Sequence, residues 1–277
     1  MIKLENYEVL GWEHAIRGMR NPMNSWEKSD SETINMTLKK HELAPGVETL
    51  DYEPCVPYTS IGHNDLDLMM RLRNAGTDHR KFMRMITVYV DIIAPLYWWK
   101  EFDTYKVGTV ANSCSTMHKI HAKEFTLEDF SCEHLIGEPY DFDHDDPIDG
   151  EFDDKRLVLV ANNDNGWLGH CYYTASGNKC VEYLAPKTLL DKYIISALNA
   201  CREAYLKTKD KKYWWQMIQL LPSSYNQKRT IKFNYEVLTN IYKSRKTHKL
   251  DEWRDFCAWI ENLPYSEIIT GYLEDEK

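Results

Sequence analysis

The segment Met85–Lys106, MITVYVDIIAPLYWWKEFDTYK, predicts the centre of the fold. Apolar residues occupy every second position from Ile86 to Ile92, and all four are β-branched. This period of two is typical of a strand that is covered on one face. Pro95 ends the strand, because proline has no N–H to donate to a sheet ladder. The aromatic run after it predicts a helix or a helical turn.

A small, polar stretch follows at once, GTVANSCSTMHK at Gly108–Lys119. Two interpretations are open. The stretch is either a surface loop or one wall of a polar pocket built against the preceding aromatic residues. We favour a loop that faces a ligand, on the strength of the resemblance given below.

Working outward toward the N-terminus, the pattern predicts a strand near Tyr7–Leu10 and a short helix at Glu13–Arg20. Proline and glycine punctuate the rest of the first 60 residues, which we interpret as loops. HNDLDLMMRLRNAG, residues 63–76, carries apolar residues at helical spacing. An Asn/Asp cap precedes them and a glycine follows, so it predicts an amphipathic helix.

The C-terminal third predicts helices. TLLDKYIISALNACREAYLK carries an apolar stripe, YWWQMIQLL stops at Pro222, and NYEVLTNIYKSRKTHK and DEWRDFCAWIENL follow. Asp251 is the expected cap of the last helix, which is closed at Pro264. We therefore predict an α+β fold, with a central antiparallel or mixed sheet flanked by helices and a helical C-terminal third.

Residues 1–277 are expected to form a single domain with an acidic insertion at about 126–187. GEPYDFDHDDPIDGEFDD, residues 137–154, is either a calcium loop or a solvated acidic loop. Its spacing does not match the ligand pattern of an EF-hand, so we favour the solvated loop. No metal site is predicted.

Charge and composition exclude several classes of protein. The net charge of −9 argues against binding to a nucleic-acid backbone, although it leaves room for a small anionic ligand. The sequence contains no uninterrupted stretch of about 18 apolar residues, so it predicts no membrane span. The N-terminus carries charges throughout, and the seven cysteines are scattered without a CxxC pair. We therefore expect reduced thiols and a cytoplasmic protein.

Polar residues gather in two segments, Lys100–His118 and Asn234–Glu252. Arg245 and His248 share a face near the end of a predicted helix, where they can act together on a phosphate or a carbonyl.

Each of these residues also has a structural interpretation. Asn234 can be a helix N-cap, and Arg245 can be a surface cation that is favourable near a helix C-terminus. His248 alone is more often structural than catalytic, and Glu252 can be a first-turn charge of the next helix. Cys114 has no base partner in the sequence, so we interpret it as a small buried thiol rather than a nucleophile.

The first polar segment resembles the signature of flavin-dependent thymidylate synthases (ThyX). That family carries Arg-Gln-Trp-x-Arg-His-Arg after a proline-ended strand, and a serine seven residues later. In PLYWWKEFDTYKVGTVANSCS, Lys100-Glu101-Phe102 replace Arg-Gln-Trp, and Thr104-Tyr105-Lys106 replace Arg-His-Arg. Ser115 follows after eight residues, with Asn112 three residues before it.

The second segment has the family's C-terminal layout. Twelve residues after the helix-ending Leu221-Pro222 comes Asn234, and then follow Asn240, Arg245, His248 and Glu252. GTDHRKFMRMITVYV also resembles the family's Gly-His-x-x-Pro-Phe-Glu-His segment.

The resemblance implies a homotetramer that binds FAD between subunits and methylates dUMP, with methylenetetrahydrofolate as carbon donor and NADPH as reductant. It assigns Arg245 and Ser115 to catalysis, because Arg245 would contact the pyrimidine. Ser115 and Glu101 would line the nucleotide site. The residues it assigns to the flavin are Asn112, Asn234, Asn240, Tyr105, Lys106 and His248.

The departures from the family pattern are mostly lost arginines. Thr104-Tyr105-Lys106 lacks the arginines of Arg-His-Arg, and Glu236 stands where the family has an arginine. Guanidinium groups grip phosphates in a way that neutral groups do not replace. Two alternatives therefore stay open beside dUMP methylation. The scaffold can act on another pyrimidine nucleotide, or it can be a non-catalytic assembly or binding protein.

Overall fold

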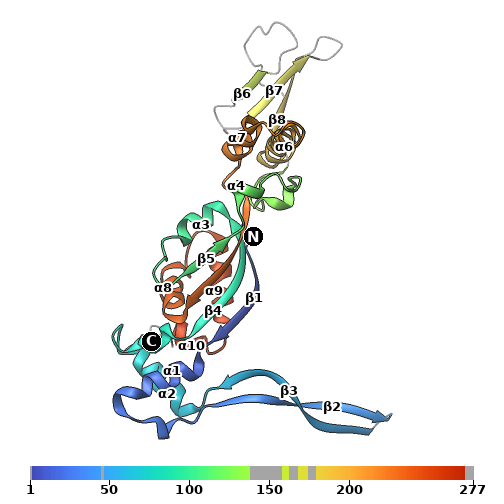
Figure 1. Ribbon diagram of the computed structural model, residues 1–277. Coiled ribbons are helices and arrows are strands. Elements are labelled where there is room, and N and C mark those ends of the chain that lie inside the picture. The colour runs from blue at the N-terminus through green and yellow to red at the C-terminus, as the bar shows by residue number, and fades with distance from the viewer. Residues whose placement is uncertain (1, 45–46, 138–157, 162–167, 174–178, 272–277) are drawn as a thin grey trace. The chain divides into compact units, whose positions relative to one another are not determined.

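The computed structural model describes residues 2–44, 47–137, 158–161, 168–173 and 179–271 (Figure 1). The chain divides into two compact units. The described residues within 2–93, 100–113 and 228–271 form what we name the sheet unit. Those within 94–99 and 114–227 form the helical unit. The acidic stretch Asp141–Asp154 lies outside the described residues. One domain with an acidic insertion thus stays a prediction.

The sheet unit is built on a four-stranded sheet with the order β1-β4-β9-β5 (Figure 1). Its strands are β1 (Lys3–Leu10), β4 (Thr87–Pro95), β5 (Val110–Ser113) and β9 (Asn226–Asn234). β1 pairs antiparallel with β4, and β5 pairs antiparallel with β9. In β4, Val88 and Val90 are buried whereas Tyr89 is exposed, which confirms the predicted strand and its buried face.

β9 was not predicted, although it is a central strand. Its sequence NQKRTIKFN places a polar or charged residue at most positions and so lacks a clear apolar alternation. Ile231 and Phe233 are nevertheless fully buried. The tertiary structure therefore selects this strand through its two inward residues and its pairing with neighbours, which a local pattern cannot reveal.

The helices of the sheet unit confirm most of the predicted ones. They are α1 (Trp12–Arg20), α2 (His63–Asn74), the end of α3 (Leu96–Phe102), α8 (Tyr235–Arg245), α9 (Asp251–Glu261) and α10 (Glu267–Thr270), with 3₁₀ turns at Asn21–Met23, Trp26–Lys28 and Arg80–Arg84. The rings of Phe256 and Trp259 in α9 lie 6.2 and 6.3 Å from that of Phe233 in β9, so α9 packs on the sheet.

Two predicted caps differ in the structure. Asp251 is the first residue of α9 rather than its cap, and Leu250 precedes it without a side-chain hydrogen bond. The N-cap of α2 is Gly62, not an Asn or Asp within the helix segment. Asp30, distant in sequence, instead accepts from the backbone N–H groups of the first turn of α2. Tertiary contacts thus supply an acceptor that local sequence does not.

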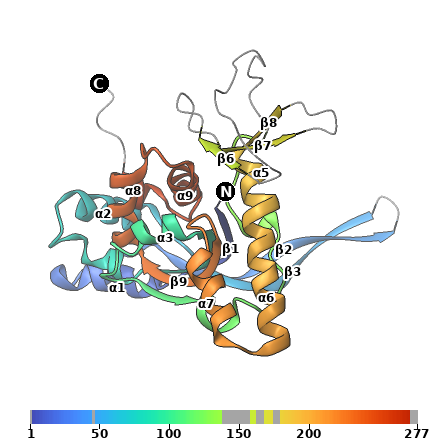
Figure 2. The ribbon, with the colours of Figure 1, turned by 90° about the horizontal axis from the view of Figure 1, so that it is seen from above.

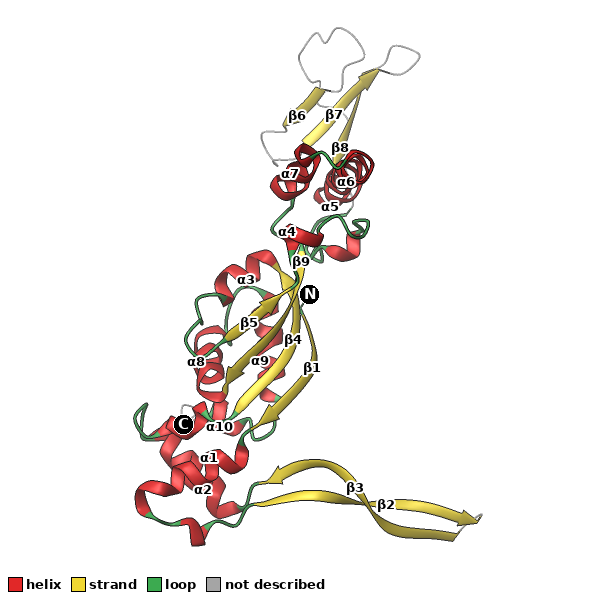
Figure 3. Cartoon of the chain, in the orientation of Figure 1, coloured by secondary structure: helices red, strands yellow, loops and turns green. Residues whose placement is uncertain are grey.

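The prediction of loops in the first 60 residues is wrong where the chain forms a long hairpin. β2 (Glu32–Ala44) pairs antiparallel with β3 (Val47–Ser60), as Figure 3 shows. Pro54 and Pro57 in β3 suggested loops, but proline is tolerated on strands that have a free edge. A two-stranded hairpin has only such edges.

The helical unit contains α4 (Thr116–Lys119), α5 (Pro186–Thr188), α6 (Ser196–Thr208) and α7 (Lys211–Leu220), a π-helical segment Leu189–Ile195 and a 3₁₀ turn Leu127–Asp129. α6 and α7 lie side by side (Figure 2). β6 (Val158–Ala161), β7 (Leu168–Tyr173) and β8 (Lys179–Leu184) form a three-stranded antiparallel sheet that was not predicted. The core contains Ile120, Phe125, Phe130, Leu190, Ile195, Leu198 and Met217.

Candidate functional site

The candidate site is a cluster of polar side chains around Glu101 in the sheet unit. Glu101 lies at the end of α3, and its Oε2 accepts hydrogen bonds from Arg245 Nη1 at 2.9 Å and from Trp253 Nε1 at 2.8 Å. His248 Nε2 lies 3.5 Å from the same oxygen. Arg245 and His248 of the C-terminal polar segment, with Trp253 just after it, therefore converge on one carboxylate of the first segment.

Arg245 is held on several sides. Its Nε donates to the hydroxyl of Tyr105 at 3.0 Å, and its guanidinium carbon lies 4.7 Å from the ring centroid of Trp253. Only 18% of its side chain is exposed. A guanidinium stacked on an indole and paired with a carboxylate has a fixed orientation. Arg245 is thus not the surface cation that one interpretation allowed.

Buried aromatic side chains of α3 and α9 hold Glu101 and Trp253 in place. Phe102 follows Glu101 in α3, is 2% exposed, and stacks on Trp253 with ring centroids 6.4 Å apart. Phe256, one turn further along α9, also packs on Phe102. α8 ends at Arg245, and the N–H of His248 donates to the carbonyl of Arg245 at 2.9 Å, which sets the turn into α9.

Cys257 lies in α9 beside this cluster, but it does not supply a nucleophile. Burial first, and then Glu261, raise the pKa of its thiol to about 11, although Arg245 acts in the opposite direction. The thiol is therefore protonated at neutral pH. The chemistry of the cluster is that of a positioned cation and a carboxylate.

Glu236, the reversed charge, has its own partners. It lies in the first turn of α8 and forms ion pairs with Arg80, at 3.4 Å, and with Arg84. Burial alone would raise the pKa of Glu236, but the two arginines outweigh it and hold this pKa below its ordinary value. The reversed charge at Glu236 is thus neutralised by two arginines of the 3₁₀ turn, which the sequence reasoning missed.

The predicted flavin residues differ in what they contact. Asn234 is the N-cap of α8: it is 7% exposed, and its Oδ1 accepts from the N–H of Val237 at 3.0 Å. This is the structural interpretation that the sequence left open. Lys106, Asn112 and Asn240 are exposed, and within the described part of the chain no hydrogen bond engages their side chains. The assignment of these residues to a flavin stays a prediction.

Ser115 belongs to the helical unit, whereas Arg245 belongs to the sheet unit. The hydroxyl oxygen of Ser115 caps α4 by accepting from the N–H of His118 at 2.9 Å. The predicted meeting of Ser115 with Arg245 therefore stays a prediction.

The interpretation of Cys114 as a buried thiol is wrong, because Cys114 is exposed. β5, just before it, pairs with β9 and is exposed along its whole length. The polar run Gly108–Lys119 is thus an edge strand and a short helix rather than one loop. The carbonyl of Cys114 accepts from Gln227 Nε2 at 2.8 Å.

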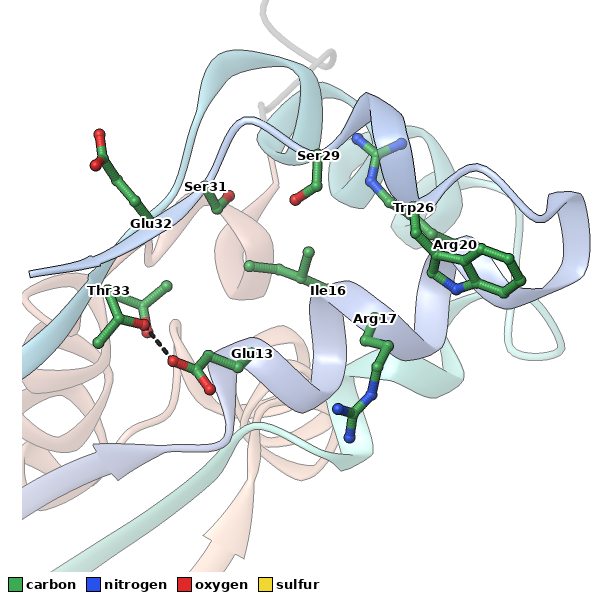
Figure 4. A pocket seen from close by; sticks show the side chains of 10 residues that line it. Glu13, Ile16, Arg17, Arg20, Trp26, Ser29, Ser31, Glu32 and Thr33 are labelled. Atoms are coloured by element: carbon green, nitrogen blue, oxygen red, sulfur yellow. Dashed lines mark hydrogen bonds between the residues drawn. The ribbon is translucent and has the colours of Figure 1, made fainter.

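A separate hollow of about 340 Å³ lies between α1 and the chain that leads into β2 (Figure 4). Ile16 points into it, and Trp26 and Arg20 flank it. Arg20 is 4% exposed and donates to the fully buried Asp65 at 2.7 Å, so its charge is already paired. The sequence reasoning missed this pair, since the two residues are 45 positions apart.

Comparison with known proteins yields a fold but no sequence family. No family model and no curated protein matches the chain. Two solved structures of thymidylate synthase X from Helicobacter pylori, both with FAD and dUMP, match with TM-scores of 0.51 and 0.50. Each of these structures is 14% identical in sequence to this chain, and each match covers 96% of this chain. The matches cover 94% and 95% of the two thymidylate synthase chains.

The fold is ThyX-like. This confirms the predicted α+β class, the sheet flanked by helices and the helical character of the C-terminal part. At 14% identity the likeness does not extend to chemistry. None of the described helices combines the length and the apolar composition that crossing a bilayer requires. Among the described residues there is also no cluster of His, Cys, Asp and Glu suited to a metal ion.

Proposed function

We propose that this protein is a divergent ThyX-like flavoenzyme that reductively methylates a pyrimidine nucleotide, dUMP in the first place. The observation that carries the proposal is the convergence of Arg245 and His248 on Glu101 within a ThyX-like fold. Two sequence segments, 144 residues apart at this contact, supply a guanidinium, an imidazole and a carboxylate to one place.

Arg245 would bind the base. Its Nε and Nη1 are engaged by Tyr105 and Glu101, and among the described residues no hydrogen bond engages Nη2. A guanidinium held in this way can donate to a pyrimidine carbonyl without first losing rotamer freedom. Glu101 Oε1 is likewise without a bond in the described part of the chain, and it can accept from an N–H of the base.

The polar residues of the sheet unit fit a flavin in their chemistry. Lys106, Asn112 and Asn240 present an ammonium and two amides to solvent, the donors that suit a pyrophosphate and the edge of a flavin ring. Asn234 fits less well, because its oxygen is committed to the cap of α8. When bound, FAD reduced by NADPH supplies the hydride, and methylenetetrahydrofolate supplies the carbon.

One observation favours a second candidate, the same scaffold with another nucleotide or without catalysis. Glu101 stands where the family has a glutamine, and its negative charge pairs with Arg245. A carboxylate next to the proposed nucleotide site repels an anionic ligand more than an amide does. Glu236 adds to this argument, because it commits Arg80 and Arg84 to the protein itself.

The proposal is tested with purified protein. We expect yellow protein, or uptake of added FAD, and release of tritium from 5-labelled dUMP in the presence of NADPH and methylenetetrahydrofolate. Arg245→Ala should lower kcat/KM by roughly 10- to 100-fold, because it removes a charged hydrogen bond. Arg71→Ala is the matched control: Arg71 is 69% exposed on α2 and should leave the rate within about twofold.

A colourless protein that fails to bind added FAD would contradict the proposal. Bound FAD with no turnover of dUMP, but turnover of another pyrimidine nucleotide, would favour the altered substrate.

A further inference from the structure

The turn between α6 and α7 concentrates positive charge on the helical unit. The six residues 207–212 include four exposed lysines: Lys207, Lys209, Lys211 and Lys212. We name this group the lysine turn. Asp210, the single acidic residue among them, is the N-cap of α7 and pairs with Lys212 Nζ at 3.1 Å. The turn therefore keeps a net charge of about +3.

The overall charge of the chain does not cancel this patch. Residues 138–154 contain nine acidic residues and neither lysine nor arginine. The charge of this segment therefore equals the net charge of the whole chain, −9. The rest of the sequence is balanced in charge. The expectation of no nucleic-acid partner rests on the overall charge of the chain. It does not apply to a positively charged patch on the part of the chain whose charges are balanced.

Aromatic rings lie among the lysines. Lys211 Nζ is 5.8 and 5.6 Å from the ring centroids of Trp214 and Trp215, and Lys212 Nζ is 4.8 Å from that of Tyr213. Trp215 is 43% exposed, a large fraction for tryptophan. Cations and flat apolar surface are thus presented together to solvent.

The helix dipole explains the positions of Lys207 and Lys209, which lie at the C-terminal end of α6, but not those of Lys211 and Lys212. Lys211 and Lys212 lie in the first turn of α7, which contains no acidic residue. The helix dipole makes cations unfavourable there and favours acidic side chains instead. Lys211 and Lys212 thus add positive charge at the positive end of the α7 dipole, of which Asp210 offsets one.

We propose that the lysine turn and Trp215 form a binding surface for single-stranded nucleic acid. The ammonium groups would contact successive phosphates, and an unstacked base would lie on the exposed indole. Single-strand binding proteins combine these two features, and stacking tolerates any sequence. An acidic polypeptide could satisfy the lysines, but it has no flat base to cover Trp215, so the aromatic part of the surface favours nucleic acid.

The test measures binding of a fluorescent 15-nucleotide oligothymidylate by anisotropy, with the full-length protein in 50 mM salt. We expect affinity that falls with salt, with a slope of log K against log salt of about −2, as expected for about three phosphates on a single strand. Lys207→Glu/Lys211→Glu should weaken binding by more than about tenfold, and Trp215→Ala by about tenfold. Lys28→Glu/Lys243→Glu, with the same charge change on exposed lysines of the sheet unit, is the matched control.

Three results would overturn the proposal. One is no binding at 50 mM salt by protein that unfolds cooperatively. Another is equal loss in the two double variants, which would indicate a general charge effect. The third is polyglutamate binding as tightly as the oligonucleotide, with no effect of Trp215→Ala, which would identify an acidic polypeptide partner. Because the readout needs neither flavin nor turnover, it is independent of the proposed enzyme activity.

Discussion

At the scale of single residues, the pair formed by Glu101 and Arg245 sets the charge of the candidate site. The family pattern has a neutral glutamine at the position of Glu101, so the substitution adds one negative charge beside the cation. Glu101 also accepts from Trp253 and lies within 3.5 Å of His248, so it organises the cluster as well as charging it. An amide of the same shape would keep part of this network without the charge.

We therefore expect Glu101→Gln to tighten dUMP binding by about tenfold, because it removes a repulsive charge next to Arg245. The cost in stability should stay below about 1 kcal/mol, since Glu101 is 37% exposed and partly exposed ion pairs contribute little. Isothermal titration calorimetry and urea unfolding measure the two effects.

Asp103→Asn is the control for Glu101→Gln. Asp103 is 46% exposed, lies two residues further on and pairs with Arg229 rather than Arg245. Equal changes in the two variants would mean that only the net charge matters, and weaker binding by Glu101→Gln would contradict the proposed role of the pair.

At the scale of the elements, Asp91 joins three strands of the sheet. It lies on β4, accepts from Thr230 Oγ1 of β9 at 2.6 Å and pairs with Lys228 Nζ of β9 at 3.0 Å. Asn6 of β1 donates to it at 3.1 Å. The hydrogen bond from Thr230, followed by those from Lys228 and Asn6, lowers the pKa of Asp91 from 3.8 to about 2. One carboxylate therefore links β1, β4 and β9 on the polar face of the sheet.

This pKa shift predicts a pH dependence of stability. The folded-state pKa lies below the unfolded one, so the ionised carboxylate stabilises the fold above about pH 4. That stabilisation is lost as the pH falls toward 2. We expect Asp91→Asn to lower the free energy of unfolding by about 1 kcal/mol at pH 7, after allowance for solvent screening, and to have little effect near pH 2.

Urea unfolding of the two proteins at several pH values measures this difference. Asp67→Asn, which removes a carboxylate that is 54% exposed on α2, is the control and should change stability little at any pH. A loss of stability in Asp91→Asn that is the same at pH 2 and pH 7 would show that shape rather than charge links the strands.

At the scale of the whole molecule, the ThyX-like fold suggests an assembly. The resemblance implies a homotetramer with FAD bound between subunits, and Lys106, Asn112 and Asn240 are exposed as groups at a shared site would be in a separate chain. We therefore expect the purified protein to sediment at about four times the chain mass of 32.7 kDa. Sedimentation velocity over a range of concentrations measures this, with and without added FAD.

A monomer at all concentrations, in protein that nevertheless binds FAD, would contradict the expected assembly. It would leave the flavin proposal standing with a site contained in one chain. A tetramer without flavin binding would favour the non-catalytic alternative instead.

Much of the fold was predictable because local patterns carried it. The alternation Ile86–Ile92 gave β4, and helical spacing gave α2, α8 and α9, since these segments bury one regular face. β9 and the hairpin β2–β3 were not predictable, because polar residues and prolines conceal strands that pairing alone stabilises. In the candidate site, the prediction that Arg245 and His248 share a helix face is wrong, because α8 ends at Arg245 and His248 lies in the turn beyond it. Trp253 and the partners of Glu236 became visible only in three dimensions.

The sequence by itself determined the α+β class and the residue types available for chemistry, because periodicity and composition act over short distances. Only the tertiary structure decided that Glu101 holds Arg245 and that Arg80 and Arg84 compensate Glu236. Each of these depends on pairing between groups that the chain brings together from far apart, and the energy of such a pair depends on distance and burial, which no local pattern records.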